Sequence, residues 1–208
     1  MTIYDVGEEK DVAFIAMDYM RGQPLRAYTE ADTLLPAVEV CTLLAQVAEA
    51  LDYAHRQGVI HRDIKPHNLM YDEQDGRVKV TDFGVARLAD TTRTRTGAIL
   101  GSPSYMSPEQ IAGEPVDGRA DVFSLGVSAF QLLTAELPFQ GDTLAALAYQ
   151  ISKQKPKALH ELRPDLPTVV SRVIGKALQK NPDRRYQRGA EFAETLRKLS
   201  TRLAKELS

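Results

Sequence analysis

The segment HRDIKPHNLM, at positions 61–70, places a carboxylate, a cation and an amide close together. The Asp63 carboxylate could orient a hydroxyl group and accept its proton as the oxygen attacks. Lys65 would reach the same side if the loop is extended, and could neutralise charge on a transferring group. Asn68 offers an amide oxygen, which is a hard ligand suited to Mg²⁺. The spacing therefore favours chemistry on a negatively charged substrate.

A second acid, Asp82, lies in TDFGVAR, where Gly84 permits unusual backbone angles. A base, a cation and two oxygen ligands suit phosphoryl transfer, which needs positioning and charge neutralisation more than covalent chemistry. Taken singly, His-Arg-Asp could be a solvated loop and Asp-Phe-Gly a turn. The specific signal is the order HRDIKPHN, DFG, GSPSYMSPEQ and RADVFSLGV.

With these four motifs the chain resembles the eukaryotic-like protein kinases, and among them the bacterial serine/threonine kinases. The resemblance runs from about Ile3 to the last helix. It implies an α+β, mainly helical fold: the large C-terminal lobe with the hinge and the last small-lobe strands. Residues 1–20 would hold the fourth and fifth small-lobe strands and the hinge, and residues 21–208 the large lobe. Within that lobe, 61–68 would be the catalytic loop and 82–109 the activation segment.

The resemblance assigns chemical roles to four residues. Asp63 would be the catalytic base and Lys65 the phosphate-contacting lysine, while Asn68 and Asp82 would bind Mg²⁺, or Mn²⁺ in its place. Lysine followed by proline is typical of the serine/threonine class. The implied reaction uses ATP and a serine or threonine hydroxyl of a protein substrate.

The adenine end of the nucleotide would meet the hinge. By the resemblance, Met17 is the gatekeeper, the backbone of Asp18 and Met20 bonds the adenine edge, and Met70 forms the apolar floor. The alternative for Met17 and Met70 is plain core packing, since both tasks need an apolar, adaptable side chain.

Other residues are interpreted as structural. Glu109 would form a buried ion pair with Arg185, with Arg184 as the alternative partner. Asp121 would accept backbone hydrogen bonds from the catalytic loop. His61 would pack and orient that loop rather than transfer protons, and no histidines have metal-ligand spacing.

The segment TTRTRTGAILGS, at 91–102, is the regulatory candidate, although it is also compatible with a merely polar, mobile loop. The resemblance favours phosphorylation at Thr94 and Thr96, where each phosphate would add about −1.5 to −2 charge and could pair with Arg62. The hydroxyl of Ser102 could bond Asp63 and Lys65. The resemblance gives structural or regulatory roles to Arg62, Phe83, Gly84 and Ser102.

The sequence contains no Gly-x-Gly, and Lys10 falls in a predicted turn. The family's Gly-rich loop and strand lysine are therefore expected upstream, with the rest of the small lobe. A chain without them is expected to be weakly active or inactive alone. The alternative is a non-catalytic scaffold lobe. A small-molecule kinase is disfavoured because GSPSYMSPEQ resembles a peptide-docking loop.

Periodicity and turn residues predict the elements that would position these groups. Residues 120–133 are apolar nearly all round, which predicts a fully buried helix. Strands are expected at 2–6, 13–18, 59–60, 69–71 and 78–81. The GEEKD segment, at 7–11, is expected to be a turn. Helices are expected at 36–57, 120–133, 143–152, 167–179 and 189–205.

Composition limits the class of protein. The 208 residues carry a net charge of −2, which does not favour nucleic-acid binding. No apolar run approaches the ~18 residues that a membrane helix needs, and the acidic N-terminus lacks a signal-peptide core. The single Cys41 excludes an internal disulfide and predicts a buried thiol in a reducing compartment. The expected location is the cytoplasm, as a soluble kinase or as the cytoplasmic part of a membrane-attached one.

Overall fold

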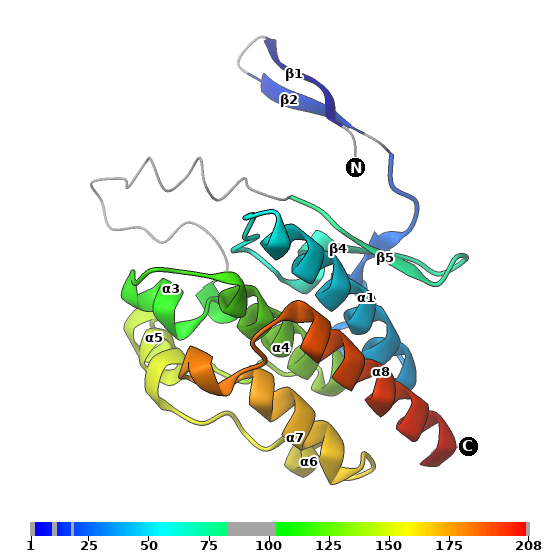
Figure 1. Ribbon diagram of the computed structural model, residues 1–208, viewed down its shortest axis with the longest axis vertical. Coiled ribbons are helices and arrows are strands. Elements are labelled where there is room, and N and C mark those ends of the chain that lie inside the picture. Colours follow the sequence, from blue (N-terminus) through cyan, green and yellow to red (C-terminus); the bar gives the residue numbers. More distant parts are fainter. Residues whose placement is uncertain (1–2, 10–11, 18, 83–102, 207–208) are drawn as a thin grey trace.

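The computed structural model describes residues 3–9, 12–17, 19–82 and 103–206. Two strands, β1 (Ile3–Glu9) and β2 (Val12–Met17), form an antiparallel hairpin that Figure 1 shows beyond one end of the helical body. The prediction of a turn from residue 7 onward is wrong, because Gly7 pairs with Phe14 and Glu9 with Val12. Cross-strand pairing thus extends the ladder through residues whose types favour turns.

A second sheet has the order β3-β4-β5, all antiparallel. It comprises β3 (Gln23–Pro24), β4 (Leu69–Asp72) and β5 (Arg77–Val80). The predicted strands at 69–71 and 78–81 are confirmed. Gly22, just before β3, has φ of 94°, and a Cβ there would lie 2.0 Å from the carbonyl oxygen of Tyr71. Only glycine allows the chain to approach β4 this closely.

The predicted strand at 59–60 is wrong, because these residues close the end of a helix. Helix α1 (Ala37–Arg56) ends with Gly58 at φ of 75°. The Gly58 amide donates to His55 O and the Val59 amide to Ala54 O, each at 3.0 Å. This pair of bonds is the Schellman C-cap, and it holds Val59 to the helix.

Helix α4 (Gly118–Thr134) lies at the centre of the molecule (Figure 1). It packs against α1, α7 (Thr168–Ala177) and α8 (Gly189–Glu206). As predicted, nearly all of it is buried. The hydroxyls of Ser124 and Ser128 bond to carbonyls one turn back, so burying them leaves no polar group unsatisfied.

The remaining elements complete a mainly helical α+β fold. Helix α5 (Leu144–Lys153) matches its prediction, whereas the short α3 (Pro108–Ala112) and α6 (Leu159–Leu162) were not expected. Brief 3₁₀ turns occupy Leu25–Tyr28, Pro66–Asn68, Pro103–Tyr105 and Pro182–Arg184. Within the described part of the chain, every helix is too short or too polar to cross a membrane.

Candidate active site

The segment predicted to be the catalytic loop, residues 61–68, lies between the C-cap of α1 and the start of β4. Ile64 is fully buried, which anchors the loop in the core and turns its neighbours outward. The backbone at Lys65 is extended (φ −159°, ψ 160°), as the sequence interpretation requires. Its Nζ donates to both carboxylate oxygens of Asp63, at 3.1 and 2.8 Å. The base candidate and the cation candidate are therefore in direct contact.

Asn68 is buried beside the same carboxylate. Its Nδ2 donates to the backbone oxygen of Asp63 at 2.8 Å and to Oδ2 of Asp63 at 3.1 Å. Both hydrogens of the amide are used in this way, so the amide oxygen is the atom that could ligate a cation. The side chain of Asp63 remains 40% exposed, which leaves it open to a substrate hydroxyl.

Asp82 joins the cluster through its neighbour Thr81. The amide and the hydroxyl of Thr81 both donate to the carbonyl of Asn68, at 2.9 and 3.2 Å. The same hydroxyl lies 3.4 Å from Oδ2 of Asp82. Asp82 itself has φ of 60°, which is a left-handed backbone conformation.

The donors fit a magnesium ion better than a softer metal. An amide oxygen from Asn68 and a carboxylate from Asp82 are hard ligands, and Mg²⁺ is held by one or two carboxylates together with substrate phosphates and water. The described residues contain no cluster of three or more His, Cys, Asp or Glu side chains able to hold a metal ion. A magnesium ion held by these two side chains would take its remaining ligands from water or from substrate phosphates.

His61 is buried, and both ring nitrogens face backbone groups. Nδ1 accepts the amide hydrogen of Asp63 at 3.2 Å, which places the ring proton on Nε2. Nε2 then donates to the carbonyl of Thr81 at 2.8 Å. The imidazole thus connects the catalytic loop to the Asp82 segment, which supports an orienting role.

Asp121, in the first turn of α4, anchors the backbone of the predicted catalytic loop. Its carboxylate is fully buried and accepts the amide hydrogens of His61 at 2.9 Å and Arg62 at 2.8 Å. Arg62 has φ of 68°, a left-handed conformation that these bonds stabilise. This is the backbone anchoring that the sequence interpretation proposed for Asp121.

His55 is a residue to which the sequence analysis assigned no role. Its Nε2 lies 2.7 Å from Oδ2 of Asp121, so it shares the carboxylate with the catalytic loop. A Cβ on Gly118 would lie 2.4 Å from Nδ1 of His55, so glycine makes room for the ring. Since 66 residues separate the pair, no local spacing reveals it.

Glu109 and Arg185 form the buried ion pair, at 2.6 and 2.7 Å. Arg184 is exposed and forms no described ion pair. Burial alone would raise the pKa of Glu109, but the hydrogen bonds and charge of Arg185 outweigh it and lower the pKa. The guanidinium also donates to the carbonyls of Gln179, Arg119 and Lys180.

Gln110 is a second residue that the sequence interpretation missed. Its Nε2 donates to the carbonyl of Arg62 at 2.8 Å, while its Oε1 accepts the Ser107 amide at 2.9 Å. The second contact belongs to a capping box that starts α3. The Ser-x-x-Gln spacing is the signal that could have revealed the helix, whereas its link to the catalytic loop is a tertiary contact.

The segments predicted to be the hinge and the activation segment are only partly described. Met70 is half-buried on β4, paired with Pro24 and Lys79, and Met20 is also half-buried. Only the backbone of Met17 is described, at the end of β2. The predictions for Asp18, Phe83, Gly84, Thr94, Thr96 and Ser102 lie outside the described residues.

Comparison with known proteins shows the family to which the chain belongs. Residues 1–197 match the protein kinase domain family. The chain belongs to the protein kinase family. It is 38% identical over 188 residues to serine/threonine-protein kinase PrkC of Bacillus subtilis, an alignment covering 90% of this chain and 29% of that protein. It is 40% identical over 203 residues to serine/threonine-protein kinase PknB of Mycolicibacterium smegmatis, covering 94% and 32%.

Solved structures agree with this assignment. The crystal structure of the Mycobacterium tuberculosis PknI kinase domain superposes with a TM-score of 0.70 at 32% identity. The match covers 95% of this chain and 69% of that one. The chain is therefore similar to bacterial serine/threonine kinases. It spans about a third of the length of the curated relatives that it matches.

Proposed function

We propose that this chain carries the large-lobe half of a serine/threonine kinase site, which transfers the γ-phosphoryl group of ATP to a protein hydroxyl. The observation that carries the proposal is the contact of Asp63 with both Lys65 and Asn68, extended to Asp82 through Thr81. A bound Mg²⁺ would neutralise phosphate charge in such a site.

The reaction assigns a task to each side chain. Asp63 receives the proton of the serine or threonine hydroxyl as that oxygen bonds to the γ-phosphorus. The bond from this phosphorus to the bridging oxygen breaks, and ADP leaves with the electron pair. Lys65 offsets charge on the transferring group, and its two bonds fix the carboxylate plane of Asp63. Asn68 and Asp82 are the proposed metal ligands.

The chain alone is proposed to transfer phosphate slowly. Its sequence has no Gly-x-Gly to cover the phosphates. Loss of one preorganised charge partner costs about 10²–10³ in rate at comparable sites. A form joined at its N-terminus to the Gly-rich loop and lysine strand of a kinase relative should therefore be faster by at least that factor.

The test measures transfer of radiolabel from γ-labelled ATP and Mg²⁺ to a basic protein, using the joined form. Asp63→Asn should lower the rate by about 10²–10⁴, the range for loss of a general base. Asp75→Asn, an equivalent change in the exposed β4–β5 turn, should leave the rate unchanged. Equal rates for Asp63→Asn and the parent would refute the base assignment.

Nucleotide binding is measured separately by the thermal shift with Mg·ATP. Asp82→Asn should reduce this shift, because it removes the carboxylate proposed to hold the cation. A joined form that shows neither a shift nor any transfer would favour the alternative, a non-catalytic lobe that only binds other proteins.

A further inference from the structure

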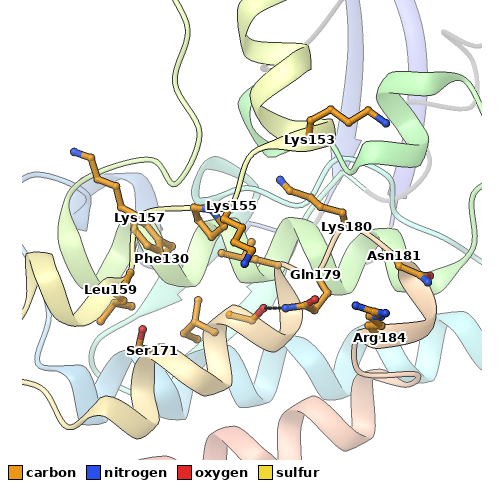
Figure 2. Close-up of a pocket in the computed structure, with 15 residues that line it drawn as sticks. Phe130, Lys153, Lys155, Lys157, Leu159, Ser171, Gln179, Lys180, Asn181 and Arg184 are labelled. Carbon is orange, nitrogen blue, oxygen red and sulfur yellow. Dashed lines mark hydrogen bonds between the residues drawn. The ribbon is translucent and has the colours of Figure 1, made fainter.

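A cavity of about 450 Å³ lies on the helical body, lined by none of the residues of the Asp63 cluster. Its walls come from the end of α4, the extended segment 154–158, helix α7 and the loop 178–184, which Figure 2 shows around a common space. This volume lies within the range of pockets that bind ligands. The proposed phosphotransfer reaction makes no use of it.

The charged residues that line this cavity are all cationic. They are Lys153, Lys155, Lys157, Lys180 and Arg184. Lys157 also contacts Glu136 at 3.4 Å, whereas no described ion pair involves Lys153, Lys155 or Arg184. The whole chain has a net charge of −2, so this local excess runs against its overall balance. A concave surface of one charge sign raises the local concentration of oppositely charged groups.

The cations are spread along the cavity rather than gathered at one point. Residues at both ends of segment 154–158 have extended backbone, with ψ of 142° at Gln154 and 126° at Ala158. Two residues of extended chain span about 6.6 Å, so Lys155 and Lys157 match acidic groups at alternate positions of an extended partner. Figure 2 shows Lys155 between Lys157 on one side and Lys180 on the other.

Lys180 forms a fixed part of the wall. Its Nζ donates to the carbonyls of Gln150 and Ile151 near the end of α5, and it lies 3.5 Å from the ring centre of Phe139. Burial, together with the nearby charge of Arg185, lowers the pKa of Lys180 to about 7. Near neutral pH, the more exposed lysines and Arg184 therefore carry most of the attraction for an anion.

The floor of the cavity is apolar. It is formed by Phe130, Leu159, Ile174 and Leu178, all at most 2% exposed. Gly175 lies inside α7, and a Cβ added there would meet no atom within 4 Å. Glycine inside a helix costs about 0.5–1 kcal/mol relative to alanine, and packing among the described residues does not require a glycine at this position. The glycine keeps the floor open.

We propose that this cavity, the lysine pocket, binds an extended acidic segment of a partner protein. Carboxylates at alternate positions would meet Lys155 and Lys157, and an apolar side chain between acidic residues would rest on the floor. A free phosphate would engage only part of the row. A flat anionic membrane would contact the exposed lysines without reaching the recessed floor.

Fluorescence anisotropy of a labelled synthetic peptide, DSDSLSDSD, against the 208-residue chain tests the proposal. Saturable binding that weakens with salt is expected. Lys155→Glu should raise Kd at least about tenfold, because an attraction becomes a repulsion. Lys205→Glu, which makes the same charge change on the exposed face of α8, should alter Kd by less than about twofold. Both lysines are exposed, so neither change threatens folding.

The apolar part of the site is tested without any charge change. Gly175→Phe should fill the floor and abolish peptide binding, whereas Gly175→Ala should retain it. Absence of peptide binding to the parent chain would overturn the proposal, as would equal effects of the Lys155 and Lys205 changes. Binding confined to inorganic phosphate or phosphatidylglycerol vesicles would also overturn it. None of these outcomes depends on phosphotransfer, so the two proposals fail separately.

Discussion

Removal of the Glu109 carboxylate tests the buried ion pair that this group forms with Arg185. Arg185 is fully buried, and each of its five guanidinium hydrogens has an acceptor: two on Glu109 and three on backbone carbonyls. Glu109→Ala would leave two donors without partners and a buried positive charge without its counter-charge.

The expected loss follows from these contacts. Hydrogen bonds to charged groups contribute about 1.5–3 kcal/mol each, so two of them amount to about 3–6 kcal/mol. Breaking a buried ion pair by removing one partner typically costs about 3–5 kcal/mol, which agrees. We therefore expect Glu109→Ala to lower the free energy of unfolding by about 3–5 kcal/mol.

Urea unfolding followed by circular dichroism measures this loss. Arg184→Ala is the matched control, since Arg184 is exposed and was the alternative partner in sequence; it should change stability by less than about 0.5 kcal/mol. Folding lowers the pKa of Glu109 from its ordinary value of 4.5. The unfolded state therefore binds more protons than the folded state when the pH falls below 4.5. The gap between parent and Glu109→Ala should therefore narrow as the pH falls below that value. A loss under about 1 kcal/mol for Glu109→Ala, similar to the control, would refute the reasoning.

Four further outcomes are expected. His55→Ala in the joined form should reduce kcat about tenfold, because Asp121 loses a hydrogen bond that helps to orient the catalytic loop, while the Mg·ATP thermal shift persists; an unchanged kcat would contradict this. Gly175→Ala should raise the free energy of unfolding by about 0.5–1 kcal/mol. Gly126→Ala should lower it by about 1–3 kcal/mol, since its Cβ would lie 2.8 Å from that of Ala177; urea melts that rank the two glycine variants in the opposite order would count against the packing. Burial raises the pKa of Cys41 to about 12, so a thiol reagent should react with it only on unfolding, and rapid labelling of the native chain would be inconsistent with this burial.

The sequence predicted the helical body well because its signals are local. The apolar run at 120–133 is long enough to predict a buried helix, and Gly58 marks the end of α1. Short elements were less predictable. Val59 and Ile60 have strand-forming side chains, but the bond from the Val59 amide to Ala54 commits them to a helix cap. Pairing in the β1–β2 ladder likewise overrode the turn preference of Gly7.

The candidate site likewise contains residues that a local sequence signal reveals and contacts that only the fold creates. The roles proposed for Asp63, Lys65 and Asn68 depend on a short motif whose spacing is visible in the sequence. Contacts that join distant segments are not visible, because nothing near His55 indicates Asp121. Gln110 is intermediate, since its capping box is a local signal while its bond to Arg62 is a tertiary one. The lysine pocket could not be predicted, because Lys180 and Arg184 meet the 153–157 segment only after folding.

The left-handed backbone of Asp82 has a consequence for engineering this fold. A non-glycine residue in that conformation carries a strain of about 1–3 kcal/mol, and glycine would adopt it freely. Selection for thermal tolerance would therefore enrich Asp82→Gly, the change that deletes the proposed metal ligand. Directed evolution of a more thermostable chain should also screen for a nucleotide-dependent shift in melting temperature, since selection for heat resistance alone would favour loss of the proposed metal ligand.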